Sequence, residues 1–76
     1  MGVSKNKRTI AIGEKLKQLR KDNGYTSYEN FAMDHDINRM YYWGAEKGRN
    51  LSLKYLIKIL KIHNLTLHEF FKDLDV

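Results

Sequence analysis

The sequence predicts an all-α fold of five helices, and three observations lead to this prediction. Apolar residues recur at helical spacing in several segments, while no segment of useful length alternates apolar and polar residues as a half-buried strand does. Residue types that begin or end helices separate these segments; those at predicted starts are Ser27, Asn38 and Thr66, and those at predicted ends are Gly24, Gly48 and Asn64. Proline is absent from the 76 residues, so nothing enforces a break or a linker.

The first helix is predicted over residues 10–23. Its apolar residues recur at the i, i+4 and i+7 spacing of a buried helix face, at Ile12, Leu16 and Leu19. The residues before it are polar and basic, which is typical of a mobile chain end. We therefore expect a flexible basic arm over residues 1–9 and a folded domain over residues 10–76.

Two short helices around a tight turn are predicted within residues 27–50. The first buries Phe31 and Ala32, and Asp36 stands at the bend, where aspartate tolerates the left-handed conformation better than most residues. Asn38 can cap the second helix. Two short helices joined by such a turn form a helix-turn-helix, whose second helix lies in the major groove of DNA.

Capping residues also place the other helix boundaries. The first helix of the pair has two alternative caps, Ser27 and Thr26, the latter with capping-box spacing to Glu29. Thr66 and Glu69 repeat that spacing and predict a short final helix. The fourth helix is expected to turn its lysines outward and its apolar residues inward; it covers residues 53–63, with Leu53, Leu56, Ile57 and Leu60 as the inward set.

Basic residues outnumber acidic ones by fourteen to nine, which gives a formal net charge of +5. Two segments carry the excess, residues 1–21 with seven basic residues and residues 39–61 with six. If the fold joins these segments into one surface, they make the electrostatic footprint of a nucleic-acid-binding protein. In the alternative interpretation, the lysines only keep a small helical domain soluble.

Several classes of function are disfavoured by the residue types present. Cysteine is absent, which removes disulfides, thiolate catalysis and cysteine-bound zinc. No serine has a base at a motif spacing and no glycine-rich phosphate loop occurs, so we expect no enzyme, no cofactor and no small-molecule ligand. His35 lies between Asp34 and Asp36, but neighbouring helix residues point in different directions, and we expect no metal site.

The sequence offers no sign of a membrane protein. No apolar run approaches the roughly 18 residues of a membrane span, and the first residues have no secretory apolar core. We therefore expect a cytoplasmic protein that does not contact membranes.

The pattern of core and turn residues resembles that of a known family. The matching positions are, in chain order, Gly13, Leu16, Leu19, Arg20, Phe31, Ala32, Ile37, Glu46 to Asn50, Ser52, Leu53, Leu56, Ile57, Leu65 to Leu67, Phe70 and Phe71. In them the chain resembles the Cro and phage-repressor helix-turn-helix family, also called XRE-like. Its length resembles the small stand-alone controller proteins of restriction-modification systems. The resemblance implies a five-helix transcriptional regulator that binds a double-stranded DNA operator, often as a homodimer.

The third helix is the candidate DNA-reading element. With the buried side facing the core, a helical wheel turns outward Met40, Trp43, Gly44 and Lys47, flanked by Arg39 and Tyr41. Arg39 is the best candidate for a base contact, because its planar fork can bond both O6 and N7 of guanine. Met40 and Tyr41 can pack on a thymine methyl or reach a phosphate, and Gly44 can only allow close approach. For Trp43, DNA contact and protein packing both stay open.

Phosphate contacts are expected around this helix. Lys47, Arg49 and Asn50 follow it, where the family commonly contacts the sugar-phosphate backbone; the alternative is a solvated loop. Tyr28 stands where the family usually has a phosphate-holding glutamine, and its hydroxyl can still bond a phosphate oxygen. The predicted DNA-binding residues are Tyr28, Asn38, Arg39, Met40, Tyr41, Trp43, Lys47, Arg49 and Asn50.

Two further predictions concern structure rather than readout. The resemblance implies an ion pair between Arg20 and Glu46 that holds the reader helix to the first helix. The apolar side chains of the final helix exceed what a short terminal helix needs to seal a small core, so we predict a dimer interface there; its residues are Leu67, Phe70, Phe71 and Leu74. The alternative is that all four fold into the core of a monomer.

A second class of function stays open at this point. An antitoxin-like or other protein-interaction module would use the same fold without strong operator reading. Asp34 and Asp36 near the turn, Trp43 on the reader face and Tyr28 in place of glutamine favour that alternative. The basic segments favour DNA, and a sequence-specific transcriptional regulator is the main expectation.

Overall fold

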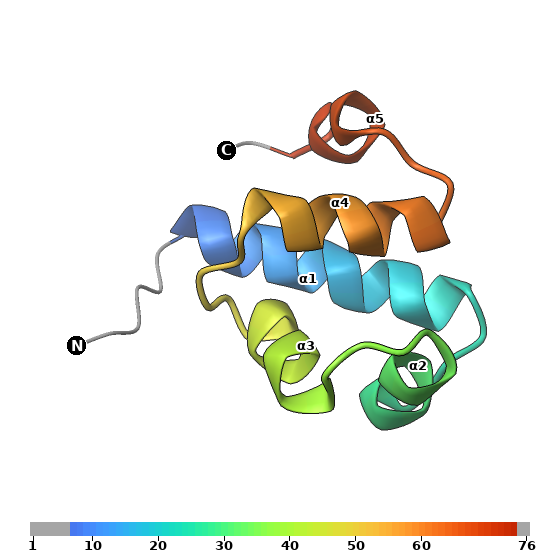
Figure 1. Cartoon of the computed structure of the whole chain (residues 1–76). Coiled ribbons are helices and arrows are strands. Elements are labelled where there is room, and N and C mark those ends of the chain that lie inside the picture. The colour runs from blue at the N-terminus through green and yellow to red at the C-terminus, as the bar shows by residue number, and fades with distance from the viewer. Residues whose placement is uncertain (1–6, 75–76) are drawn as a thin grey trace.

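The computed structural model describes residues 7–74, which form five helices in the order predicted (Figure 1). Their bounds are α1 Lys7–Asp22, α2 Tyr28–Asp34, α3 Arg39–Glu46, α4 Leu53–Ile62 and α5 Leu67–Phe71. No strand occurs between residues 7 and 74, so the all-α prediction is confirmed. In Figure 1, α2 and α3 lie on one side of the long α1, and α4 and α5 lie toward the other.

The first helix begins earlier than predicted. It starts at Lys7 rather than at residue 10, so residues 7–9 of the expected arm form its first turn. Lysine and arginine are good helix formers, so residues 7–9 can add a turn before Ile10, which packs near Gly48. The remainder of the expected arm, residues 1–6, lies outside the described residues.

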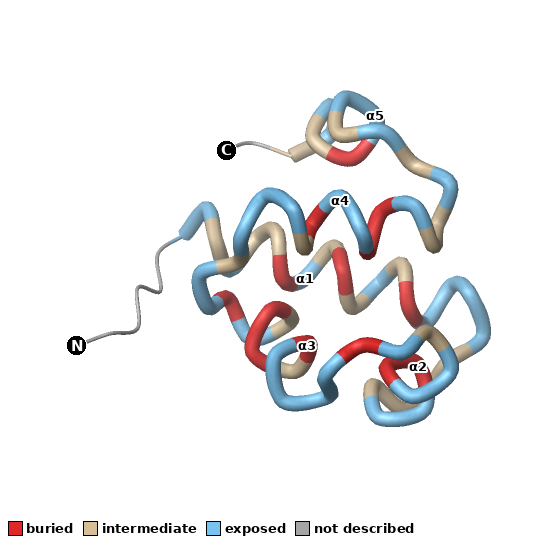
Figure 2. Tube along the Cα trace, in the orientation of Figure 1, coloured by how far each residue is buried: buried red, intermediate tan, exposed pale blue. Residues whose placement is uncertain are grey.

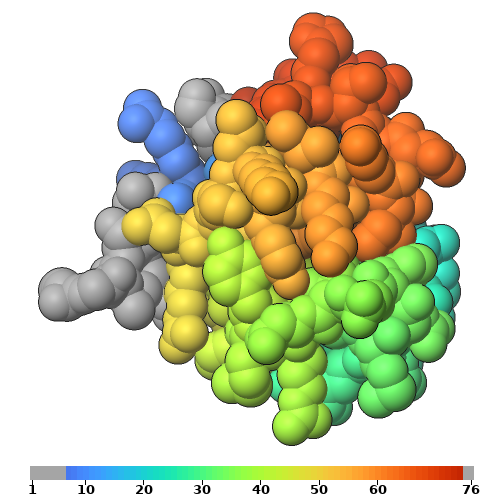
Figure 3. Space-filling view, viewed as in Figure 1, coloured from blue at the N-terminus to red at the C-terminus, as the bar shows by residue number. Residues whose placement is uncertain are grey.

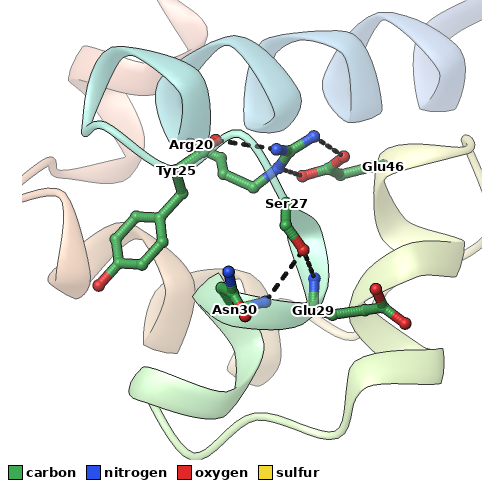
Figure 4. Close-up of polar contacts among 6 residues, drawn as sticks. All are labelled: Arg20, Tyr25, Ser27, Glu29, Asn30 and Glu46. Atoms are coloured by element: carbon green, nitrogen blue, oxygen red, sulfur yellow. Dashed lines mark hydrogen bonds and ion pairs between the residues drawn. The ribbon is translucent and has the colours of Figure 1, made fainter.

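Side-chain caps begin α2, α3, α4 and α5. Ser27, rather than the alternative Thr26, caps α2: its Oγ accepts hydrogen bonds from the backbone N–H groups of Glu29 and Asn30 at 3.1 and 3.3 Å (Figure 4). Asn38 caps α3 as predicted, with Oδ1 2.9 Å from the backbone nitrogen of Tyr41. The remaining two caps are Ser52 for α4 and the capping box of Thr66 with Glu69 for α5.

The turn between α2 and α3 depends on Asp36. Its φ of 56° lies in the left-handed region, which an aspartate enters at lower cost than most residues. The backbone N–H of Ile37 then bonds the carbonyl of Ala32 at 2.8 Å, and the Ile37 side chain is buried. This anchor fixes the angle at which α3 leaves the turn.

The core lies where the buried sides of the helices meet (Figure 2). Its buried hydrophobic residues are Leu16, Phe31, Ala32, Ile37, Tyr42, Ala45, Leu56, Ile59, Leu60 and Phe70. Two predicted core positions on α4 are wrong: Leu53 is 61% exposed and Ile57 is 36% exposed. The buried face of α4 is centred on Leu56, Ile59 and Leu60 instead, because those three positions share one face at i, i+3 and i+4 spacing.

One helix crossing requires a glycine. A Cβ atom at Gly13 of α1 would lie 2.6 Å from the carbonyl oxygens of both Ala45 and Glu46 on α3. That distance is far below van der Waals contact, so only glycine lets the two helix backbones approach this closely. The long first helix thereby holds α3 directly by backbone contact.

Candidate nucleic-acid interface

A buried ion pair fixes the end of α3 to α1. The Nε and Nη2 atoms of Arg20 donate to the two carboxylate oxygens of Glu46 at 2.7 and 3.1 Å (Figure 4). Nη1 of Arg20 donates to the carbonyl oxygen of Tyr25 at 2.9 Å. The two side chains of the pair are 5% and 6% exposed, and the hydrogen bond to Glu46 raises the pKa of Arg20. A bidentate pair of this kind fixes orientation as well as distance.

The α3 face opposite this ion pair carries the predicted reading residues. The Arg39 side chain is 67% exposed and forms a loose ion pair, with Nη1 3.9 Å from Oε2 of the exposed Glu29. Met40 beside it is 57% exposed. An exposed pair at that distance contributes little stability, so Arg39 can leave Glu29 for another partner at small cost.

Tyr41 joins α3 to the start of α4. Its hydroxyl oxygen accepts the backbone N–H of Ser52 at 3.1 Å, and its ring packs edge-on against Tyr55 with the centroids 4.2 Å apart. A tyrosine hydroxyl is both a donor and an acceptor. With its oxygen held by Ser52, the hydroxyl of Tyr41 still has its proton to donate, for example to a phosphate oxygen.

An open groove lies along this face. It is lined by Asn38, Met40, Tyr41, Arg49 and Tyr55. Four of these were predicted as DNA-binding residues, and the structure brings them together from α3, its cap and the segment after it. In the space-filling view the surfaces of α3, of the segment after it and of α4 adjoin on one face (Figure 3). The fifth residue, Tyr55, was missed because its partner Tyr41 lies fourteen residues away on another helix.

Cations gather at the C-terminal end of α3. The ring of Trp43 has Lys47 Nζ at 5.6 Å and the guanidinium carbon of Arg49 at 5.4 Å from its centroid, within the range of cation–π attraction. Lys47, Arg49 and the adjacent Asn50 are all exposed. Trp43 itself is half-buried, and its ring contacts the side-chain cations of both Lys47 and Arg49.

Two predicted residues take a different place. Gly44 was expected to face outward, but it is buried because the Arg49 side chain covers it. Tyr28, at the first residue of α2, is half-buried against the core and is not among the residues that line the groove. A helical wheel could not predict the burial of either residue, because residues outside its own helix cover each of them.

The predicted dimer residues separate into two groups. Phe70 is fully buried, so it belongs to the core and the prediction for it is wrong. Phe71 and Leu74 are half-buried. Leu67 lines an apolar groove between α4 and α5, and the other lining residues are Ile57, Leu60, Lys61, Leu65 and Thr66. Ile57 and Leu65 were both missed at this surface. For Ile57 the reason is that the predicted inward face of the fourth helix was rotated from the observed one.

Two of the three histidines, His35 and His63, take part in the packing of α2. His35 and His63 both pack on the Phe31 ring, with centroids 4.7 and 5.4 Å from it, the His63 ring nearly parallel. Burial, with a smaller effect of His35, lowers the pKa of His63. Among residues 7–74 no group of three His, Asp or Glu side chains could hold a metal ion, and none of the described helices is long and apolar enough to cross a membrane.

Two known proteins are similar to this chain. Control protein C.MunI of a Mycoplasma species is 45% identical over 67 residues, which cover 87% of this chain and 90% of the relative. The crystal structure of the restriction-modification controller protein C.AhdI from Aeromonas hydrophila matches with a TM-score of 0.71 and 31% identity, over 83% of this chain and 96% of the other. No protein-family model matches the sequence.

Proposed function

The chain belongs to the family of restriction-modification controller proteins, and we propose that it regulates transcription by binding a specific double-stranded DNA operator through α3. The exposed side of α3, with Arg39, Met40 and Tyr41, enters the major groove, as the second helix of a helix-turn-helix does. Both relatives carry the name of control or controller proteins, which favours a regulator over the antitoxin-like module.

The observation that carries this proposal is the rigid mounting of an exposed basic face. The pair of Arg20 with Glu46 and the close crossing at Gly13 hold one side of α3. The opposite side presents the exposed Arg39 and, beyond the end of the helix, Lys47 and Arg49. A reading helix must keep its register while its side chains meet base edges, and this mounting supplies that rigidity.

Each residue of the surface has a role set by its position. Arg39 reads a guanine, since it stands at the N-terminal end of α3 with an exposed guanidinium. Tyr41 donates its hydroxyl proton to a phosphate while Ser52 holds its oxygen. Lys47, Arg49 and Asn50 contact the backbone, and the exposed Asn38 completes the groove wall while its side chain caps the helix.

Selection of bound duplexes from a random pool tests this function. We expect a shared sequence to be enriched, and its binding to weaken steeply with salt because neutralised phosphates release counterions. Arg49→Ala should weaken that binding, whereas the charge-matched control Lys21→Ala, at the end of α1, should leave it within about twofold of wild type. The proposal would be contradicted if no shared sequence were recovered and both variants changed DNA binding equally.

We further propose that the protein works as a homodimer through the apolar groove between α4 and α5. Ile57 is 36% exposed on the rim of this groove, whose other apolar lining residues are Leu60, Leu65 and Leu67. An exposed apolar patch is typical of a contact surface. A two-fold contact would place two copies of α3 at successive major grooves, about 34 Å apart, and predicts a near-palindromic operator.

Analytical ultracentrifugation at micromolar concentration tests the dimer. Ile57→Glu places a charge on the groove without disturbing a fully buried residue, and we expect it to produce monomers. Met33→Glu is the matched control, because Met33 is 75% exposed on α2 and should not affect association. A monomeric wild type that binds one half-site with full affinity would rule out the dimer.

A further inference from the structure

Gly44 is covered by a side chain of its own chain. It is buried in the middle of α3, and a Cβ atom placed there would lie 2.9 Å from Cδ of Arg49 and 3.6 Å from its Nη1. The aliphatic part of Arg49 therefore runs across the helix at the one position without a side chain. Mid-helix glycine is unfavourable, so this position calls for an explanation in the folded structure.

The backbone after α3 turns Arg49 toward Gly44. Gly48 takes a φ of +92°, a left-handed conformation that glycine adopts without steric cost. The N–H of Gly48 then bonds the carbonyl of Ala45 at 3.2 Å, and the N–H of Arg49 bonds the carbonyl of Gly44 at 2.9 Å. These two bonds are the Schellman motif, which brings the residue after the left-handed one over the helix position that Gly44 occupies.

The guanidinium of Arg49 is placed by this arrangement. Its carbon lies 5.4 Å from the centroid of the Trp43 ring, and Arg49 also lines the groove with Tyr41 and Tyr55. The side chain is thus laid between the ring of Trp43 and the groove. A freely moving arginine would lose more rotamer entropy on binding a phosphate than one that is already held.

We propose that Gly44 is a positioning residue for DNA binding, which acts by leaving room for Arg49 to lie across α3 and present its guanidinium at the edge of the groove. This inference rests on the proposed DNA-binding function. It differs from the expectation that Gly44 lets DNA itself approach closely, because Arg49 occupies the space beside the glycine. Gly44 therefore affects operator binding only through the position of Arg49.

A double-mutant cycle of Gly44→Ala and Arg49→Ala tests the inference. The added methyl meets a flexible side chain and not backbone, so Gly44→Ala should fold and be no less stable than wild type in urea. It should weaken operator binding toward the level of Arg49→Ala. In the Arg49→Ala background it should change affinity by less than about twofold, because no guanidinium remains to be displaced.

A readout without DNA separates this inference from the proposed function. Trp43 is the single tryptophan of the chain, so acrylamide quenching of its fluorescence reports how well Arg49 covers it. Quenching should increase in Gly44→Ala and in Arg49→Ala to a similar degree, with no further increase in the double variant. If the wild type bound no operator while quenching followed this pattern, only the proposed function would fail.

Two results would overturn the inference. One is an equal loss of operator affinity on Gly44→Ala with and without Arg49, which would mean that the glycine faces DNA directly. The other is unchanged binding and unchanged Trp43 quenching in Gly44→Ala, which would mean that Arg49 does not depend on Gly44 for its position.

Discussion

Arg20 and Glu46, twenty-six residues apart in the sequence, form an ion pair with Nε 2.7 Å from Oε2, and both side chains are almost fully buried. The geometry joins the last turn of α1 to the last residue of α3. Tyr42 is fully buried on the same helix as Glu46, and burial raises the pKa of its hydroxyl, which keeps it neutral. The pair thus leaves α3 little freedom to rotate about its own axis, and that rotation would change which side chains face the groove.

Removing one member of this pair should destabilise the fold. Arg20→Met or Glu46→Gln leaves the other charge buried without a partner, and we expect a loss of about 3–5 kcal/mol in the free energy of unfolding. Urea unfolding measures this change. The control is the exposed pair of Arg39 and Glu29, where the same kind of substitution should cost under about 1 kcal/mol. A double variant at positions 20 and 46 that simply added the two single effects would show that the residues are not coupled.

Gly13→Ala should destabilise the protein although alanine is the better helix former. Propensity alone predicts a gain of about 1 kcal/mol, but the new Cβ would meet two backbone carbonyl oxygens at 2.6 Å. Carbonyls within a helix cannot move aside as a flexible side chain can, so we expect a net loss of about 1–3 kcal/mol. Gly44→Ala is the matched control, since its Cβ meets only the Arg49 side chain. Equal or greater stability of Gly13→Ala would mean that α1 and α3 can separate freely.

The five helices were predictable because their boundaries are set locally. Ser27, Asn38 and Thr66 each bond backbone N–H groups within three residues, so the signal that begins a helix lies beside it in the sequence. The left-handed residues Asp36 and Asn64 were also recognisable from residue type. The start of α1 was placed too late by the same local reasoning, at residue 10 rather than at Lys7.

The positions that the sequence did not predict are those that distant packing decides. Six leucines and isoleucines lie on α4, so its pattern alone could not show that Ile59 is buried and Ile57 is exposed. Phe70 and Phe71 are neighbours of the same type, and only their packing separates a core residue from a half-buried one. Arg49 reaches Gly44 through a turn beyond the helix, which a helical wheel does not include.

Arg39→Ala should relax the preference of the protein at one base position. A bidentate arginine–guanine contact contributes about 1–3 kcal/mol of discrimination against the wrong base. Competition binding with duplexes that each carry one base change measures it. Arg49→Ala is the contrasting variant: it should weaken all duplexes similarly and lower the slope of log affinity against log salt by about 0.9. Full base preference in Arg39→Ala would exclude Arg39 as the reader.

The free energy of unfolding should fall as the solution is made acidic below about pH 6.5, the ordinary pKa of histidine. The pKa of His63 is lowered in the folded state by burial and by the nearby His35, so the unfolded chain takes up this proton first. Stability contributed by neutral His63 is therefore complete above pH 6.5 and is lost on acidification toward the lower folded pKa. Urea unfolding between pH 7.5 and pH 5 measures the slope.

Two variants identify the source of this pH dependence. His63→Phe keeps a ring where His63 now stacks on Phe31 at 5.4 Å but cannot take up a proton, and it also removes the buried Nε2 atom, which has no hydrogen-bond partner. It should therefore flatten the slope without lowering stability at pH 7.5. His68→Gln changes an exposed histidine on α5 and should leave the slope as it is. If His63→Phe kept the full slope, the proton that destabilises the fold would be taken up elsewhere in the chain, and the stacked histidine would be a packing residue only.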